Sequence, residues 1–300
     1  MRRAVSVSLG DPARDKAVEV SMNGVPIRIE RIGTGGDIRR AQELFAELDG
    51  QVDALSVGGM DLYVRMEARE YPIRSALKLV KGVKNTPLVD GRALKYVYES
   101  RLFELVGEEL GDNPRYKRAF MPFSIDRLGL AEAVSAVTDD LILGDLLFAL
   151  GVPWTIKGLP RFKQIARILM PLMSYLPLSM ILPPGVEGEQ RKPKAERLWR
   201  SADLIVGDMH YIYTYSPPDL HGKTVITNTT TPPNIELLRE RGVKTVVTTS
   251  PRYDGRSFGI NTMEAALTAY AGLGRPLSDD ELNALIDEVK LMPWVETLNP

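Results

Sequence analysis

The first third of the chain alternates short apolar runs with segments of helical periodicity. Asn23-Gly24 separates two apolar runs and is the dipeptide that a type I′ turn requires, so a hairpin is predicted there. Residues 38–48 repeat apolar side chains at helical spacing. The predicted strands cover residues 5–9, 17–22, 25–32, 53–57 and 87–89, with a second small hairpin at 62–66 and 70–73, and the predicted helices cover 38–48, 74–81 and 91–106.

The rest of the chain repeats this alternation with shorter connections. The predicted strands cover residues 154–157, 178–182, 203–206, 223–227 and 243–248, and the predicted helices cover 128–137, 141–150, 162–175, 235–241, 263–271 and 279–289. The alternating Tyr211, Tyr213 and Tyr215 indicate a further short strand. Strands separated by helices imply right-handed βαβ units and a mostly parallel sheet.

We therefore predict an α/β fold with two α/β domains. The first covers residues 1–125 and is expected to hold the substrate. The second covers residues 126–300 and is expected to be a Rossmann-like, doubly wound and mostly parallel sheet. The C-terminal helices are able to pack back on the first domain.

The composition narrows the chemistry. Lys and Arg number 38 against 39 Asp and Glu, so there is no basic surplus for a nucleic acid or an anionic membrane. The sequence has no Cys and 2 His, which excludes thiolate sites and His-rich metal centres, and we expect no metal. Any chemistry depends on Lys, Asp, Glu, Ser, Tyr, backbone groups or a cofactor.

Residues 162–183 are the one stretch whose hydropathy is like that of a membrane span. Prolines and the charged Lys163 and Arg167 interrupt it, whereas a spanning helix needs about 20 mostly apolar residues. A buried helix followed by a buried strand is the better interpretation. The apolar stretch at the N-terminus is too short for a signal sequence, so we expect a cytoplasmic protein with no membrane partner.

Two acidic residues come after apolar strands in the first domain. Asp61 comes after residues 53–57 and Asp90 directly after 87–89, at the strand ends where the sites of parallel sheets gather. Lys95 lies five residues after Asp90, in the first turns of the next helix, so it is expected to point back toward the crevice at Asp90. An Asp/Lys pair suits proton transfer to or from a hydroxyl if burial and neighbouring groups lower the pKa of the lysine. The alternative is an Asp that caps a helix and a solvated Lys.

Small polar residues come after the strands of the second domain. Asn228, Thr229 and Thr230 come after one strand and Thr249 after another, so they would border a ligand crevice at the strand ends. The alternative is that they terminate strands and cap helices. Gly259 precedes a further helix that begins near Asn261 and Glu264, with Asn261 as its expected cap.

The turn expected to hold a cofactor phosphate comes after the strand at residues 154–157. Lys157 and Gly158 lie there, with a single glycine where a dinucleotide domain has Gly-x-Gly-x-x-Gly. In this interpretation the charge of Lys157 or Arg161 takes over part of the role of the missing backbone groups.

Several stretches, strongest within the first hundred residues, resemble bacterial proteins labelled quinate (or shikimate) 5-dehydrogenase. They are residues 6–8 (Ser-Val-Ser), 33–37, 58–61 and 87–95. Shikimate dehydrogenases carry a Ser-x-Ser element, an Asn-x-Thr-x-Pro-x-Lys motif and a Lys/Asp pair, followed by a glycine-rich NADP domain. The resemblance implies that Ser6, Ser8 and Gly59 bind the substrate and that the cofactor is NAD or NADP.

Two features depart from that family pattern. Residues 228–234 have most letters of the second motif, but Asn234 stands where the lysine belongs and the motif lies in the other half of the chain. The glycine-rich loop is absent.

These observations favour an NAD(P)-dependent oxidoreductase acting on a small hydroxy acid of the quinate or shikimate type. Lys95, Asp90 and Asp61 are its candidate catalytic residues, and Lys157, Gly158, Asn228, Thr229, Thr230 and Thr249 its candidate cofactor-binding residues. The alternatives are a non-redox, metabolite-binding or regulatory protein with a degenerate nucleotide fold, and a lyase or isomerase that uses Lys95 without a nucleotide. The partner is a small-molecule substrate, and the sequence is compatible with a homodimer.

Overall fold

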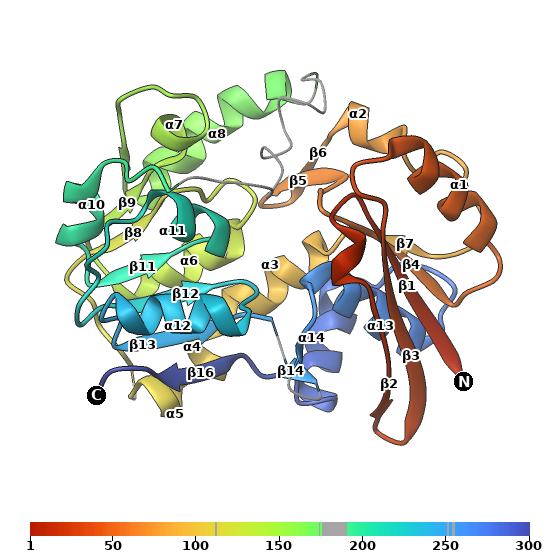
Figure 1. Cartoon of the computed structure of the whole chain (residues 1–300). Coiled ribbons are helices and arrows are strands. Elements are labelled where there is room, and N and C mark those ends of the chain that lie inside the picture. The colour runs from red at the N-terminus through yellow and green to blue at the C-terminus, as the bar shows by residue number, and fades with distance from the viewer. Residues whose placement is uncertain (112, 174, 176–190, 251, 254–255) are drawn as a thin grey trace. The chain divides into compact units, whose positions relative to one another are not determined.

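The computed structural model describes residues 1–111, 113–173, 175, 191–250, 252–253 and 256–300 (Figure 1). The chain divides into two compact units. Unit 1 comprises Met1–Val97, Ile168–Gly185 and Gly259–Leu291, and unit 2 comprises Tyr98–Arg167, Val186–Phe258 and Met292–Pro300. The predicted division lay at residue 125, whereas here residues 98–125 belong to unit 2. The C-terminal segment at 259–291, whose helices were expected to be able to pack on the first domain, belongs to unit 1.

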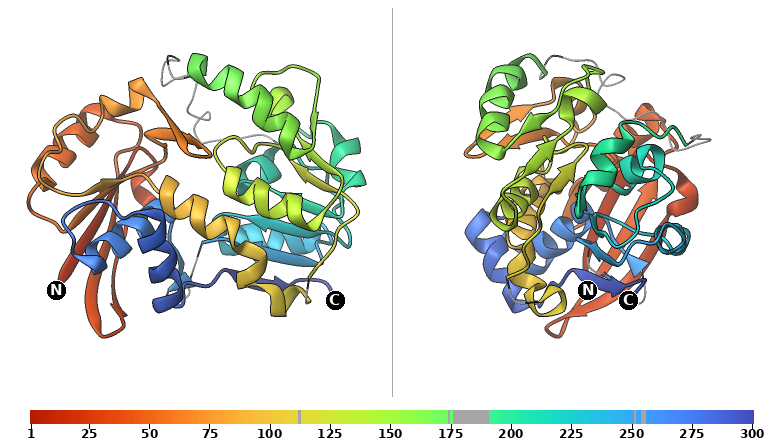
Figure 2. Two further views of the ribbon diagram at one scale, coloured as in Figure 1. Left: turned by 180° about the vertical axis from the view of Figure 1, so that it is seen from behind. Right: turned by 90° about the vertical axis from the view of Figure 1, so that its left-hand side faces the viewer.

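Unit 1 is built around a five-stranded sheet in the order β2-β3-β1-β4-β7. Its strands are β1 (Arg2–Ser8), β2 (Lys16–Met22), β3 (Val25–Gly33), β4 (Ala54–Gly58) and β7 (Leu88–Val89). All neighbours are parallel except β2 and β3, which form the predicted hairpin, red in Figure 2. Asn23 and Gly24 both have positive φ at its turn, as the predicted turn type requires.

The two faces of this sheet have different side chains and different helices. Val5, Val7 and Leu55 are buried with the apolar face of α1 (Ile38–Leu48). The opposite face carries small residues, among them Ser6 and Ser56, and α13 (Ile260–Ala271) packs there against β1 and β4. The small side chains allow this close packing. The segment after β7 also lies close to α13, because a Cβ at Gly91 would be 2.7 Å from the backbone N of Asn261.

The other elements of unit 1 are short. They are η1 (Pro12–Arg14), the hairpin of β5 (Tyr63–Met66) and β6 (Arg69–Pro72), α2 (Arg74–Leu77), α14 (Asp279–Glu288), and the start of α3 (Arg92–Ser100), which continues into unit 2.

Unit 2 contains a seven-stranded sheet in the order β10-β9-β8-β11-β12-β13-β16. Its strands are β8 (Ala119–Met121), β9 (Leu141–Leu143), β10 (Ile156–Lys157), β11 (Leu204–Val206), β12 (Thr224–Thr227), β13 (Thr245–Thr248) and β16 (Trp294–Thr297). The five inner strands are parallel, and β10 and β16 are antiparallel edges. Counted from β8, the first six strands have the order 3-2-1-4-5-6 that is typical of dinucleotide-binding sheets, with the third strand reversed.

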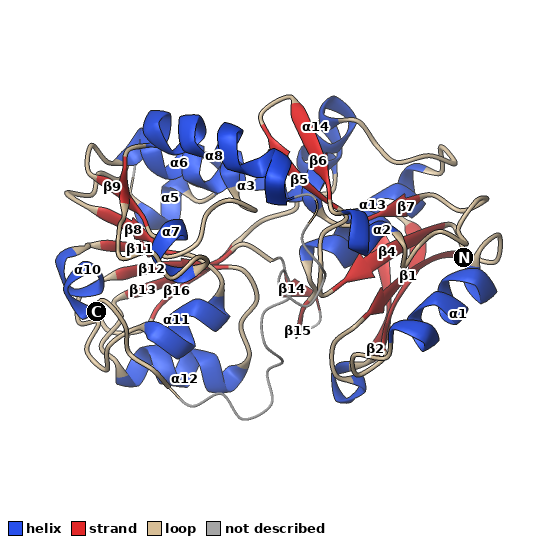
Figure 3. Ribbon diagram, turned by 90° about the horizontal axis from the view of Figure 1, so that it is seen from above, coloured by secondary structure: helices blue, strands red, loops and turns tan. Residues whose placement is uncertain are grey.

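Helices cover both faces of this sheet. In Figure 3, α6 (Leu128–Val137) and α8 (Leu159–Met173) lie on one face, and α11 (Met209–Tyr215) and α12 (Pro232–Glu240) on the other. The remaining elements are α4 (Leu102–Leu105), α5 (Gly107–Leu110), α7 (Asp145–Phe148), α10 (Glu196–Ser201), β14 (Arg252–Tyr253) and β15 (Arg256–Ser257). The predicted α/β class and the doubly wound, mostly parallel second sheet are confirmed.

Three local predictions turn out differently. Residues 141–143 form a strand rather than the start of a helix, because a short, fully buried apolar run has no periodicity that separates the two states. The tyrosines at 211–215 lie in α11, whose N-terminus is capped by Asp208. The predicted strand at 178–182 lies outside the described residues.

Candidate functional site

The carboxyl ends of β4 and β7 lie side by side in the unit 1 sheet. The two strands are parallel neighbours, so the segments after them begin at the same edge. Asp61 comes after β4 across a short glycine turn, Asp90 comes directly after β7, and Lys95 lies in the first turn of α3. The structure therefore brings the three candidate catalytic residues to one edge of one sheet.

Lys95 and Asp61 form an ion pair at this edge. Lys95 Nζ lies 2.9 Å from Asp61 Oδ2. The lysine side chain is 8% exposed and the aspartate side chain 23% exposed. The pair thus combines a largely buried amine with a carboxylate that solvent reaches. The sequence pointed to Asp90 as the partner of Lys95, whereas the ion pair is made with Asp61.

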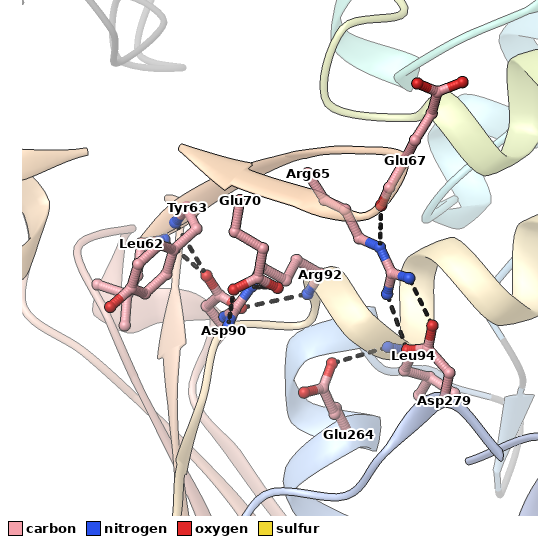
Figure 4. Close-up of polar contacts among 10 residues, drawn as sticks. All are labelled: Leu62, Tyr63, Arg65, Glu67, Glu70, Asp90, Arg92, Leu94, Glu264 and Asp279. Atoms are coloured by element: carbon pink, nitrogen blue, oxygen red, sulfur yellow. Dashed lines mark hydrogen bonds and ion pairs between the residues drawn. The ribbon is translucent and has the colours of Figure 1, made fainter. Parts of the chain in front are cut away.

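Asp90 is the structural member of the three. Its Oδ2 accepts hydrogen bonds from the backbone N of Leu62 at 2.7 Å and of Tyr63 at 3.3 Å, and its Oδ1 accepts from the guanidinium of Arg92 at 2.7 Å (Figure 4). The side chain is fully buried. Because these donors take both oxygens, Asp90 fixes the segment after Asp61 onto the start of α3 and acts as a positioning residue.

An arginine completes this support. Arg92 also makes a two-point ion pair with Glu70, at 2.8 and 3.0 Å, and its guanidinium lies 4.5 Å from the centre of the Tyr63 ring. Two-point pairs of this kind hold both side chains in one orientation. The β5–β6 hairpin is thereby attached to the end of β7, next to the Asp61–Lys95 pair.

Glu264 is a further acid that the sequence assigned only to a helix start. It is buried in α13, and its Oε2 accepts a hydrogen bond from the backbone N of Leu94 at 3.0 Å (Figure 4). Burial, and secondarily the charge of Asp90, raises the pKa of Glu264 to about 8. Near neutral pH it is therefore a proton-carrying acid beside the Asp61–Lys95 pair. A signal was present, since a glutamate amid the apolar residues at 263–269 is unusual.

The family resemblance implied that Ser6, Ser8 and Gly59 bind the substrate. These three residues lie on β1 or just after β4, and each has different neighbours. Ser6 is buried beneath α13, and its hydroxyl accepts a hydrogen bond from Asn261 Nδ2 at 2.8 Å. Ser8 is nearer the strand end and accepts from the backbone N of Gly10 and from Arg31 Nη2, each at 3.1 Å. Gly59 comes after β4 beside Ser8 with a φ of 83°. Ser6 thus holds α13 on the sheet, and Asn261, expected as a cap, is its partner.

The polar residues at the strand ends of unit 2 are hydrogen-bonded in pairs. Thr230 and Thr248 hydroxyls lie 3.2 Å apart, and Thr229 lies 3.4 Å from Ser250. Asn228 donates to the carboxylate of Asp208. Thr249 donates to Glu99 at 3.4 Å, so all four candidate residues at these strand ends interact with side chains of unit 2 itself.

Lys157 and Gly158 lie at the opposite end of that sheet. β10 runs antiparallel to β9, with Lys157 opposite Ile142 and the Gly158 N–H bonded to the carbonyl of Leu141 at 2.8 Å. They therefore lie beside the start of β9, away from the carboxyl ends of the parallel strands. The prediction that these two residues form a cofactor-binding turn was wrong, because β10 runs opposite to its neighbour. The sequence pattern does not give the direction of a strand.

The first βα turn of unit 2 is instead residues 122–127, between β8 and α6. It contains no glycine, and the N–H groups of Ser124 and Ile125 donate to the carboxylate of Asp145. In a dinucleotide domain, N–H groups of this turn receive the pyrophosphate. The turn therefore does not fit an NAD(P) diphosphate in the usual manner, and no hydride-transfer step is derived for it.

Residues 228–234, which have most letters of the shikimate dehydrogenase motif, form the connection from β12 to α12. The Thr231 hydroxyl accepts from the backbone N of Asn234, and Asn234 Oδ1 accepts from the backbone N of Thr231 at 3.0 Å. These reciprocal bonds make a capping box at the start of α12. Asn234 thus has a local structural role where the family motif has its lysine.

The described part of the chain holds neither a metal-binding cluster nor a membrane span. No group of three or more His, Cys, Asp or Glu side chains there is placed to hold a metal ion. No helix in the same residues combines the length and apolar character needed to cross a bilayer.

The fold and the polar edges define an α/β protein with two mostly parallel sheets, one of them in the strand order of dinucleotide-binding domains. Residues 93–298 match the family described as domain of unknown function (DUF8754), and the chain belongs to that family. Residues 3–90 match a second description, domain of unknown function (DUF8753). No curated protein matches the sequence.

Among solved structures, the chain is similar to hetero-hexameric glutamate dehydrogenase from Thermus thermophilus in its Leu-bound form. That chain is 12% identical, with 96% of this chain and 73% of that chain covered and a TM-score of 0.43. A Mycobacterium smegmatis structure is 11% identical, with 97% and 95% covered and a TM-score of 0.31. Another from the same organism, in complex with β-D-fucofuranose, is 9% identical, with 99% of each chain covered and a TM-score of 0.30. These scores are too low to bear on function.

Proposed function

We propose that the chain is an enzyme that acts on a small hydroxylated carboxylic acid of the quinate or shikimate type, with Lys95 and Asp61 as its acid–base pair. The observation that carries this proposal is the ion pair between Lys95 Nζ and Asp61 Oδ2 at the carboxyl ends of two parallel strands. Ligands of open α/β sheets bind at such ends.

The chemistry depends on the two side chains. The Lys95 ammonium donates hydrogen bonds to a substrate hydroxyl or carboxylate and, once deprotonated, accepts the hydroxyl proton. Asp61 holds the amine in place through the ion pair, while its exposed portion faces solvent. Asp90 and Arg92 keep the segment that carries Asp61 against the helix that carries Lys95.

The oxidoreductase form of this proposal requires a nicotinamide nucleotide as the hydride acceptor. The strand order of unit 2 supports it, since that order is typical of dinucleotide-binding sheets. The usual mode of nucleotide binding is disfavoured, because the N–H groups of the first βα turn already donate to Asp145. A nucleotide would therefore have to use the strand ends at Asn228, Thr229, Thr230 and Thr249 without that turn.

A non-redox, metabolite-binding protein is the second candidate, and the same turn favours it. A sheet of this order whose phosphate-binding groups are already bonded within the chain is suited to a role without a nucleotide. In that case the Asp61–Lys95 pair binds the hydroxy acid and no turnover occurs.

Turnover and binding assays on the same samples separate these candidates. Quinate and shikimate are supplied with NAD or NADP, nucleotide fluorescence is followed, and acid binding is measured by calorimetry. For the enzyme, Lys95→Met is expected to lower turnover by about 100-fold or more, the range typical of a lost acid–base group. Lys81→Met, a change at an exposed lysine of unit 1, is the control and is expected to leave turnover unchanged.

The outcomes are distinct. Turnover that survives Lys95→Met excludes Lys95 as the acid–base group. Acid binding without turnover under any condition favours the metabolite-binding protein. Binding of neither acid overturns the proposed substrate class.

A further inference from the structure

The connection from β8 to α6 holds the position that the phosphate-binding turn has in a dinucleotide domain. β8 is the first strand of the 3-2-1-4-5-6 order, and β11, the fourth, pairs with its other side. α6 begins at Leu128, directly after residues 122–127. The free N–H groups at such a helix start attract an anion.

In this chain the anion is supplied by Asp145, which lies just after the neighbouring strand β9. Its Oδ1 accepts from the backbone N of Ser124 and of Ile125, each at 2.9 Å, and its Oδ2 accepts from the Ser124 hydroxyl at 2.6 Å. These donors are of the kind that hold one phosphate group in a phosphate-binding loop. The carboxylate and the turn therefore satisfy each other within the fold.

The carboxyl group of Asp145 is buried against the turn. Asp145 is 8% exposed as a residue, and burial raises the pKa of its carboxyl to about 6 despite the hydrogen bonds from the turn. The short connection at Gly144 adds to the fit, because a Cβ at Gly144 would lie 2.9 Å from the carbonyl oxygen of Pro122. The carboxyl group is thus held directly against the turn.

The surroundings of the turn carry further negative charge. Arg127, the residue before α6, is buried in an ion pair with Glu99 and lies 3.9 Å from a carboxylate oxygen of Asp208. Burial raises the pKa of the nearby Tyr211 phenol, and the charges of Asp126, Asp208 and Asp145 raise it further. A diphosphate placed here would meet several carboxylates, and the nearby guanidinium is already paired.

We propose that Asp145 is a built-in substitute for the ligand phosphate, so that the first βα turn of unit 2 is closed to the diphosphate of a nucleotide by the chain itself. The proposal rests on the hydrogen bonds of Asp145 and on the strand order. It does not depend on the acid–base role of Lys95. It restricts any nucleotide of the oxidoreductase form to a mode of binding without this turn.

Replacement of Asp145 tests the proposal with inorganic phosphate, ADP and NADH as probes. Asp145→Ala frees both N–H groups, and binding of each probe is expected to strengthen at least about 10-fold, as the gain of charge-assisted hydrogen bonds would give. Asp145→Asn keeps an oxygen of the same size against the turn and is expected to gain much less. Binding is measured by calorimetry for phosphate and ADP and by nucleotide fluorescence for NADH.

Asp139→Ala is the matched control, because it removes an exposed carboxylate from the same unit and leaves the turn intact. Circular dichroism and a cooperative urea transition establish that each variant is folded, and Asp145→Ser takes the place of Asp145→Ala if the alanine variant does not fold. A folded variant that frees the turn but gains no affinity for any probe overturns the proposal. So does a wild-type chain that binds NADH more tightly than the freed variant, because Asp145 would then aid the nucleotide. If Asp139→Ala gains as much affinity for the probes as Asp145→Ala, the gain is due to net charge and the proposal is also overturned.

Discussion

At the scale of single residues, the candidate site of unit 1 consists of charged groups with different roles. Asp61 and Lys95 form an ion pair whose carboxylate is partly exposed, whereas Asp90 is fully bonded to backbone and guanidinium donors. Glu264 differs from all of them, because it is a buried acid with no ion pair among the described residues. The raised pKa of Glu264 can therefore be tested without a ligand, by measuring how the free energy of unfolding depends on pH.

Glu264→Gln is expected to make the free energy of unfolding less dependent on pH. The pKa of Glu264 is raised from 4.5 to about 8 by burial, so between these values the folded state holds a proton that the unfolded state has released. Stability from this group is complete below the unfolded pKa and is lost as pH rises toward the folded pKa. The variant, which cannot ionise, is expected to gain up to about 4 kcal/mol relative to wild type between pH 5 and pH 9.

Urea unfolding of both proteins across this pH range measures that difference. Glu109→Gln, at an exposed position of unit 2, serves as the comparison and should behave like wild type. A difference between Glu264→Gln and wild type that does not change with pH would mean that Glu264 is ionised in the folded protein.

At the scale of elements, strand ends and helix caps share the same residue types, which is why the sequence left two interpretations open. Residues 228–234 resemble a substrate-binding motif, but Thr231 and Asn234 cap α12. Asn228, Thr229 and Thr230 bond to neighbouring strand ends. A substrate-binding motif and a helix cap use the same residue types here, so only the hydrogen-bond partners distinguish the two interpretations.

Thr231→Ala is expected to lower the free energy of unfolding by about 1 kcal/mol and to leave turnover unchanged. The loss arises because the backbone N of Asn234 no longer has its side-chain acceptor. Thr297→Ala, at an exposed position of β16, provides the comparison and should cost less. Loss of turnover in a stable Thr231→Ala protein would instead point to contact with a substrate.

At the scale of the whole molecule, unit 1 is discontinuous in sequence. The first 97 residues supply its sheet, and α13 and α14 come from Gly259–Leu291. α13 covers the small-residue face of β1 and β4, where Asn261 bonds to Ser6 and Ser56. The early segment alone therefore leaves one face of its sheet without a helix.

A fragment of residues 1–97 is expected to lack a cooperative urea transition, because it cannot bury that face. The same fragment joined by a flexible Gly/Ser linker to residues 259–291 is expected to regain one. Circular dichroism and NMR dispersion measure both. A cooperative transition in the short fragment would mean that α13 is dispensable for the fold of unit 1.

The sequence predicted most of the local pattern and part of the site. Turn chemistry explains the hairpin at Asn23-Gly24. The rule that parallel strand ends share an edge explains why Asp61, Asp90 and Lys95 lie together, but it did not give the partner of Lys95, which is Asp61 and not the expected Asp90. It could not predict the direction of β10, on which the role of Lys157 depended. Nor could it place Asp145 or Glu264, because both depend on contacts between segments far apart in the chain.

The late position of α13 also has a consequence for how the protein is made. During synthesis the strands of unit 1 leave the ribosome before the helix that covers them, because that helix ends at Ala271, 174 residues after Val97. At about 5–20 residues per second, the nascent chain waits on the order of 10–30 s with one face of that sheet uncovered. Chaperones that act on emerging polypeptides would meet this surface while most of unit 2 is being synthesised.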